Sequence, residues 1–215
     1  MLSDALAASL DEAWGPARRV GALGKASIEE LWAHTAGFTL AVCSAFGADC
    51  STWNGRILDA GTGPGIPGVL LACQLPMAEL VLVDSSDRRL DHARAAVRAL
   101  ELADRVRVVH GRLDELAHES THRSSYEVVV ARLLAEPAET AELVLPCVAR
   151  GGVAVVSCRQ DQAAEWRRLG ENIAGVEAAT ITSGSRGTFV TVAVTDELPW
   201  SYPRRSAVRA RKPLI

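Results

Sequence analysis

Short apolar runs recur along the chain from residue 56 onward and are separated by longer amphipathic stretches. The runs lie at 57–58, 80–83, 106–109, 128–130 and 153–156. Several of them are apolar at consecutive positions, which is typical of strands that are covered on both faces. The pattern therefore predicts a mostly parallel sheet buried between helices.

The stretches between these runs have the periodicity of helices. They lie at 68–75, 87–102, 136–149 and 160–173. Pro137 suits the first turn of the third helix, and Gly151-Gly152 should follow its end. Because strands and helices alternate, we expect an α/β fold with a doubly wound sheet.

The two ends of the chain depart from this alternation. Residues 1–55 read as an N-terminal helical cap, since Ser27 and Glu30 have the spacing of a capping box. The apolar stretches at 176–182 and 188–195 flank a Ser-Gly-Ser-Arg-Gly turn and predict a terminal antiparallel hairpin at or near the sheet edge. We therefore divide the chain into a helical cap, an α/β domain and a basic tail, at 1–55, 56–198 and 199–215.

A glycine-rich loop follows the first predicted strand, in the segment ILDAGTGPGIPG that starts at Ile57. Glycines at a strand-to-helix turn permit positive φ and allow a ligand to approach the backbone. The spacing Gly63-x-Gly65-x-x-Gly68 fits a dinucleotide fingerprint. The spacing that starts at Asp59 and continues through alternate glycines fits the loop of methyltransferases that use S-adenosylmethionine.

The carboxylate of Asp59 favours the second interpretation. It would repel an anionic pyrophosphate, whereas the ammonium and sulfonium of S-adenosylmethionine are cationic. The second strand ends in Asp84, where a carboxylate can accept hydrogen bonds from ribose hydroxyls. A nicotinamide dehydrogenase remains the alternative.

These motifs resemble the RsmG/GidB family, the bacterial 16S rRNA guanine-N7 methyltransferases. The resemblance rests on ILDAGTGPGIPGVLLA, on LVDSSDRRLDHARAAVRALEL and on the ending YPRRSAVRARKPLI. It also includes the turn at Arg112-Leu113-Asp114 and the step Ala131-Arg132 in which the fourth strand ends. It implies a Rossmann-like class I methyltransferase.

The resemblance also implies a set of residues around S-adenosylmethionine. Gly61 and Ile66 should line the methionine and ribose side, Leu113 and Asp114 should contact the adenine, and Arg132 should lie where cofactor and target meet. The full expected set is Asp59, Gly61, Thr62, Gly63, Gly65, Ile66, Asp84, Ser85, Leu113, Asp114 and Arg132. No catalytic base is expected, because guanine N7 carries a free lone pair and catalysis would come from alignment.

Two segments near the expected target cleft depart from the family pattern. The N-terminal region lacks the family's Asn-Leu-Thr element, and the residues 157–160 replace its Lys-Gly after the fifth strand. These differences leave open a divergent cofactor-binding protein that does not methylate rRNA, or a methyltransferase with another substrate.

The charge of the chain is unevenly distributed. The net charge of −3 combines a tail of +5, from residue 204 to the end, with a body of −8. An acidic body with a basic tail predicts that the tail meets RNA phosphate. The expected partner is 16S rRNA or the small ribosomal subunit, contacted through Arg159, Arg204, Arg205, Arg209, Arg211 and Lys212.

Composition excludes other classes. Five scattered cysteines without a C-x-x-C spacing argue against a disulfide framework or zinc knuckle and favour a reduced cytoplasm. No signal peptide is visible, and the uncharged stretch 60–78 holds too many Gly and Pro for a membrane span. The H-E-x-x-H match at His118–His122 lies in a polar segment and is interpreted as coincidence, so we expect no metal. Nothing in the pattern specifies an oligomeric state.

Overall fold

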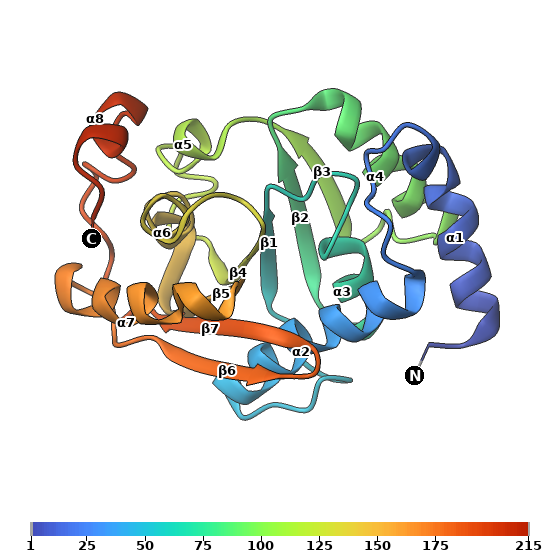
Figure 1. The fold of residues 1–215 in the computed structure, drawn as a ribbon, viewed down its shortest axis with the longest axis horizontal. Coiled ribbons are helices and arrows are strands. Elements are labelled where there is room, and N and C mark those ends of the chain that lie inside the picture. Colours follow the sequence, from blue (N-terminus) through green and yellow to red (C-terminus); the bar gives the residue numbers. More distant parts are fainter. Residues whose placement is uncertain (1, 215) are drawn as a thin grey trace.

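A seven-stranded sheet runs through the centre of the computed structural model, which describes residues 2–214 and only the backbone of residues 169–172. Its strand order is β3-β2-β1-β4-β5-β7-β6 (Figure 1). The strands are β1 (Arg56–Ala60), β2 (Glu79–Asp84), β3 (Val106–His110), β4 (Tyr126–Arg132), β5 (Val148–Cys158), β6 (Thr180–Gly184) and β7 (Gly187–Ala193).

Strands β1 to β5 are parallel, and β7 pairs antiparallel with both β5 and β6. The mostly parallel doubly wound sheet and the terminal hairpin at its edge are therefore confirmed. The chain order reverses at the centre of the sheet, where β1 pairs with β2 on one side and with β4 on the other. A doubly wound sheet binds its ligands at the carboxyl ends of strands beside such a reversal.

Helices cover both faces of the sheet. They are α1 (Asp4–Arg19), α2 (Ile28–Phe46), α3 (Gly68–Gln74), α4 (Asp87–Ala99), α5 (Leu113–Leu116), α6 (Pro137–Val144), α7 (Ala163–Asn172) and α8 (Ser206–Arg211). Figure 1 shows α1 beside α4 on one flank, and α6 and α7 on the other. The predicted capping box at the start of α2 is present, with Ser27 and Glu30 bonded reciprocally.

Two hydrophobic clusters form the core, one on each face of the sheet. The first joins the N-terminal helices to α3 and the underlying strands, and it includes Trp14 and Phe38, whose side chains are fully buried. The second lies under α5, α6 and α7 and includes Tyr126 and Trp166. The N-terminal cap therefore shares a core with the sheet.

The helix predicted at 136–149, which is α6 in the structure, is shorter than the sequence pattern predicts. It ends at Val144, a 3-10 turn covers Leu145–Cys147, and residues 148–152 already belong to β5. Gly151-Gly152 lie inside this long strand instead of ending a helix. At Gly152 a Cβ would lie 2.6 Å from the carbonyl oxygen of Glu127, so the glycine permits close backbone contact next to an irregularity in the pairing of β4 and β5.

A disulfide joins Cys43 near the end of α2 to Cys50 in the loop that follows. This contradicts the expectation from cysteine spacing, because the pairing depends on the turn after α2, which brings the two Cα atoms to 5.6 Å. The other three cysteines are free. Among residues 2–214 no helix is long and apolar enough to span a membrane.

Candidate active site

The glycine-rich loop lies at the carboxyl end of β1, at the centre of the sheet. Gly61, Gly63 and Gly65 have φ of 74°, 58° and 103°, in the region that glycine adopts without a Cβ penalty. The amides of Gly61 and Thr62 both donate to the Val83 carbonyl at 2.9 Å and join the loop to the end of β2. The indole Nε1 of Trp14 donates to the Pro64 carbonyl at 2.8 Å, so α1 also holds the loop.

Asp59 lies in β1, just before this loop, and its side chain is fully buried. Its Oδ2 accepts from the Thr62 hydroxyl at 2.5 Å and from the Gly68 amide at 2.8 Å, whereas its buried Oδ1 has no partner among the described residues. Burial raises the pKa of Asp59 to about 7, and the two hydrogen bonds only partly oppose this. An unpartnered acceptor that is poised to ionise fits a cationic ligand group.

Asp84 ends β2 and organises the neighbouring backbone. Its Oδ2 accepts from the Gly63 amide at 2.9 Å. Its Oδ1 accepts from the Ser86 amide at 2.8 Å and pairs with Arg89 at 2.9 Å. The carboxylate therefore holds the glycine loop against the start of α4.

A cleft of about 260 Å³ opens beside these residues. It brings together five residues predicted for the cofactor, namely Gly61, Asp84, Ser85, Leu113 and Asp114. Leu133, Leu134 and Leu143 add apolar walls, while Glu139 and Arg209 add charge. The lining therefore combines leucine side chains with several charged groups, among them Arg89 and Arg112. Apolar surface beside directed acceptors and donors suits a nucleoside-like ligand.

Other predicted cofactor residues lie outside this cleft lining. Thr62 and Gly63 act in the loop's own hydrogen bonds, and Gly65 packs near Val69 and Ala93. Ile66 is buried in the core with 4% exposure instead of flanking the cleft. Its apolar side chain suited either environment, and only the packing of the following helix shows which one it occupies.

Arg132 ends β4 and is half-buried. Burial lowers the pKa of its guanidinium, and the nearby Asp59 partly opposes this effect. Within the described chain the Arg132 side chain forms no hydrogen bond or ion pair. Burial lowers the pKa of His34 on α2, and the positive charge of Arg132 lowers it further. Arg132 therefore supplies a positive charge near the carboxyl end of the sheet, close enough to Asp59 to interact with it electrostatically.

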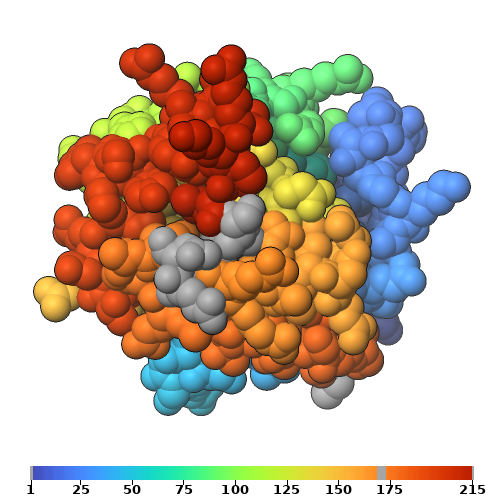
Figure 2. Space-filling model, turned by 60° about the vertical axis from the view of Figure 1, so that its left-hand side comes forward, coloured from blue at the N-terminus to red at the C-terminus, as the bar shows by residue number. Residues whose placement is uncertain are grey.

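The C-terminal tail folds back onto the body and does not extend into solvent. Arg123 anchors it by donating to four backbone carbonyls, two of them in the tail (Pro199 and Tyr202) and one just before it (Leu198), and its guanidinium stacks 4.4 Å from the Trp200 ring. Figure 2 shows the red C-terminal residues packed against the rest of the chain. One face of the exposed Trp200 ring is thus already covered by Arg123.

Two of the predicted RNA-binding arginines make internal ion pairs. Arg204 binds the buried Glu142 carboxylate through both its Nε and Nη2, each at 2.7 Å. Arg209 is buried and pairs with Asp114 at 3.3 Å and with Glu139 at 3.5 Å. Burial opposes ionisation of Asp114, but Arg112 and Arg209 outweigh it and lower its pKa.

The tail's role at the cleft could not be recognised from sequence. An arginine that pairs with a carboxylate inside the protein cannot be distinguished by sequence from an arginine that binds RNA phosphate. The other predicted cations of the tail, Arg205, Arg211 and Lys212, are exposed. Their side chains form no ion pair among the described residues.

A second cavity, of about 400 Å³, adjoins the cleft at the carboxyl ends of β4 and β5. The two share Leu133, Leu134 and Glu139. Arg159, the remaining predicted RNA contact, lines this second cavity and pairs with Asp161 at 3.2 Å. The cavity is therefore placed to receive a target next to a ligand in the cleft.

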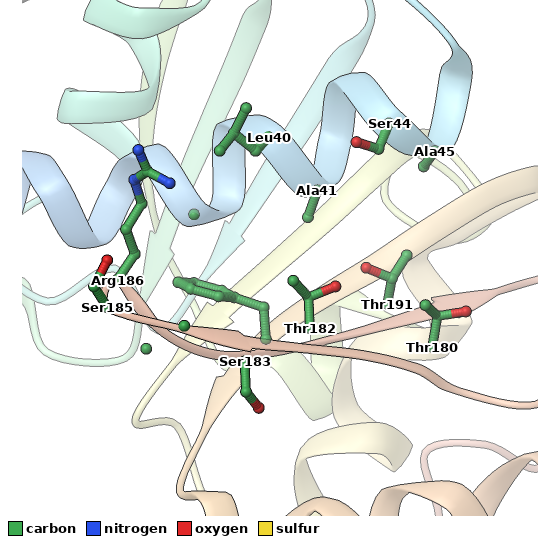
Figure 3. A pocket seen from close by; sticks show the side chains of 14 residues that line it. Leu40, Ala41, Ser44, Ala45, Thr180, Thr182, Ser183, Ser185, Arg186 and Thr191 are labelled. Carbon is green, nitrogen blue, oxygen red and sulfur yellow. The ribbon is translucent and has the colours of Figure 1, made fainter.

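A third cavity, of about 470 Å³, lies between α2 and the β6–β7 hairpin. Figure 3 shows α2 passing over the hairpin, with Ala41 directed toward Thr182 and Thr191. It shares no lining residue with the other two cavities. Its lining consists of small hydroxyl and apolar side chains together with Arg186.

The histidines of the H-E-x-x-H match have structural partners. His118 Nε2 lies 3.1 Å from the Pro203 carbonyl, and His122 Nδ1 lies 2.7 Å from the Tyr126 hydroxyl. Across the described residues there is no group of three His, Cys, Asp or Glu side chains that could hold a metal. These histidines help to hold the tail and β4.

Comparison with known proteins agrees with this geometry. Residues 17–187 match the family model GidB, described as rRNA small subunit methyltransferase G. Proteins named ribosomal RNA small subunit methyltransferase G are similar in sequence. The Rubrobacter xylanophilus protein is 34% identical over 74% of this chain and 65% of its own length. The Desulfitobacterium hafniense protein is 30% identical over 74% of this chain and 70% of its own.

Solved structures share the fold at lower sequence identity. The O-methyltransferase from Bacillus cereus, in complex with SAH, has a TM-score of 0.64 at 18% identity and covers 90% of this chain and 92% of its own. TomG from Streptomyces achromogenes, an O-methyltransferase in complex with SAM, has a TM-score of 0.59 at 18% identity, over 91% of this chain and 92% of its own. At this identity the likeness establishes the fold.

Proposed function

The chain belongs to the GidB family of rRNA small subunit methyltransferases G, and we propose that it transfers a methyl group from S-adenosylmethionine to N7 of a guanine in 16S rRNA. The chain spans slightly less than two thirds of the length of the Rubrobacter relative. The observation that carries the proposal is the glycine loop, in which the buried Oδ1 of Asp59 has no partner among the described residues. The Asp59 carboxylate would repel the anionic pyrophosphate of a nicotinamide dinucleotide, which disfavours the dehydrogenase alternative.

The residues of the loop and cleft fit the parts of S-adenosylmethionine. The buried Asp59 would offer its unpartnered Oδ1 to the cationic methionine part, and Asp84 would accept from ribose hydroxyls. Leu113 and Asp114, which both line the cleft, would contact the adenine. Arg132, at the end of β4, would act where cofactor and target meet. When bound, the cofactor supplies a methyl group made electrophilic by its sulfonium.

Catalysis in this proposal depends on alignment. The N7 lone pair forms a bond to the methyl carbon while the bond from sulfur to that carbon breaks, so no proton is removed before attack. The products are S-adenosylhomocysteine and a guanine that carries one positive charge. The protein's contribution is to hold N7 of the base in line with the methyl group. The apolar side chains of Leu133 and Leu134, which line both cavities, would exclude water from the space between base and cofactor.

The RNA partner is approached through exposed cations. Arg205, Arg211 and Lys212 are exposed and remain available to phosphate oxygens, whereas Arg204 and Arg209 hold the tail in place. We extend the proposal to 16S rRNA within the small ribosomal subunit, and hence to action in the cytoplasm. Neutralising these three side chains would weaken RNA binding and reduce its dependence on salt.

The test is methyl transfer from labelled S-adenosylmethionine to small-subunit RNA, both naked and assembled with ribosomal proteins. We expect one 7-methylguanosine per RNA with the wild type and none with Gly61→Arg, whose side chain would fill the cleft next to Leu134. A wild-type protein that binds the cofactor but methylates neither form of RNA would overturn the proposal. That outcome would support a cofactor-binding protein or a methyltransferase with another substrate.

A further inference from the structure

The second cavity holds a carboxylate that the cofactor site does not use. Glu136 lies at the N-terminal end of α6, in the segment that connects it to β4. Its side chain is 73% exposed. Its Oε2 accepts from Gln162 Nε2 at 2.8 Å and pairs with Arg159 at 3.9 Å, whereas Oε1 has no protein partner in the described part of the chain. Glu136 therefore presents an oriented acceptor at the mouth of the cavity.

The rest of the cavity suits a planar base. Leu133 lines both this cavity and the cofactor cleft. Leu133 is 78% exposed and has a φ of 54°, which L side chains adopt at a cost. Trp166 forms part of the cavity wall, and its buried indole Nε1 has no partner among the described residues. The cavity thus offers an apolar surface, a hydrogen-bond donor and a carboxylate.

We propose that this cavity receives the target base in an extrahelical position and that Glu136 is the residue that selects guanine. The Watson–Crick edge of guanine presents N1–H and an exocyclic N2 amine, two adjacent donors that one carboxylate can accept together. Adenine presents an unprotonated N1 at this edge, which would face the carboxylate with its lone pair. Gln162 orients the carboxylate by its hydrogen bond to Oε2.

Glu136 also acts on the reaction itself. Methylation at N7 places a positive charge on the purine, and a carboxylate paired with the opposite edge stabilises that charge as it develops. This role rests on the proposed function, because it requires guanine N7 as the nucleophile. It makes Glu136 a substrate-binding residue that contributes to both specificity and rate.

The control is Asp161, an exposed carboxylate that pairs with the same Arg159 but does not line the cavity. We expect Glu136→Gln to bind S-adenosylmethionine as tightly as the wild type by calorimetry. We expect its kcat/KM for methyl transfer to fall roughly 10- to 100-fold, the range for losing hydrogen bonds to a charged group. Asp161→Asn should keep wild-type activity.

A modified substrate tests the contact directly. Once the methylated guanosine is mapped with the wild type, inosine at that position removes only the exocyclic amine. The wild type should prefer guanosine over inosine by roughly tenfold, and Glu136→Gln should prefer it by less than about twofold.

Three results would overturn the assignment: wild-type activity in Glu136→Gln, an equal loss in Asp161→Asn, or an unchanged guanosine preference in Glu136→Gln. Loss of cofactor binding in Glu136→Gln would also overturn it, since the residue would then act outside the base site. Failure of the proposed function has a different signature, because the wild type itself would then leave the RNA unmethylated.

Discussion

The raised pKa of Asp59 predicts that cofactor binding weakens as the pH falls. Burial raises this pKa to about 7, above the ordinary value of 3.8. In the proposed site the cationic end of S-adenosylmethionine pairs with the ionised carboxylate. Below the folded pKa, binding must first remove a proton from Asp59, so the apparent affinity scales with the ionised fraction.

The magnitude follows from that fraction. With a pKa of about 7, Asp59 is about half ionised at pH 7, about one-tenth ionised at pH 6 and about one-hundredth ionised at pH 5. The dissociation constant should therefore rise about fivefold from about pH 7 to about pH 6, and about fiftyfold to about pH 5. The amino group of the cofactor stays protonated over this range.

Calorimetric titration across this pH range is the assay, repeated in buffers with different ionisation enthalpies to count released protons. Asp59→Asn keeps an acceptor for the Thr62 hydroxyl and the Gly68 amide, so it can fold while losing the charge. We expect this variant to bind more weakly and with no pH dependence from this group. An affinity that is flat with pH in the wild type, or a slope that persists in Asp59→Asn, would refute the reasoning.

Three further predictions concern the tail, the loop and the cysteines. Arg209→Ala should lower the free energy of unfolding by roughly 3 kcal/mol in denaturant titration, because it leaves Asp114 and Glu139 without their buried partner, whereas the exposed Arg205→Ala should change it little. Gly68→Ala should abolish cofactor binding, since its Cβ would overlap Leu82 and lie 2.6 Å from Asp59 Oδ2; Gly24→Ala, with no atom within 4 Å of a Cβ, should bind normally. Unfolded protein without reductant should react with thiol reagent at three of its five cysteines, and five reactive thiols would contradict the bond between Cys43 and Cys50.

The sequence alone determined the α/β alternation, the parallel sheet and the position of the glycine loop. These features depend on local patterns: consecutive apolar residues for covered strands, helical periodicity, and glycines where φ must be positive. The acidic residues at Asp59 and Asp84 were recognisable because they lie at fixed distances from those glycines. Local signals of this kind remain readable without knowledge of the fold.

Only the tertiary structure decided which of the candidate side chains have other partners. It buried Ile66 in the core, paired Cys43 with Cys50 and joined Arg204 and Arg209 to carboxylates far away in the sequence. It also placed Glu136 of α6 against Gln162, at the mouth of a cavity beside the cofactor cleft. The physical reason is that burial and ion pairing depend on what the rest of the chain brings nearby, and composition and spacing do not specify those long-range contacts.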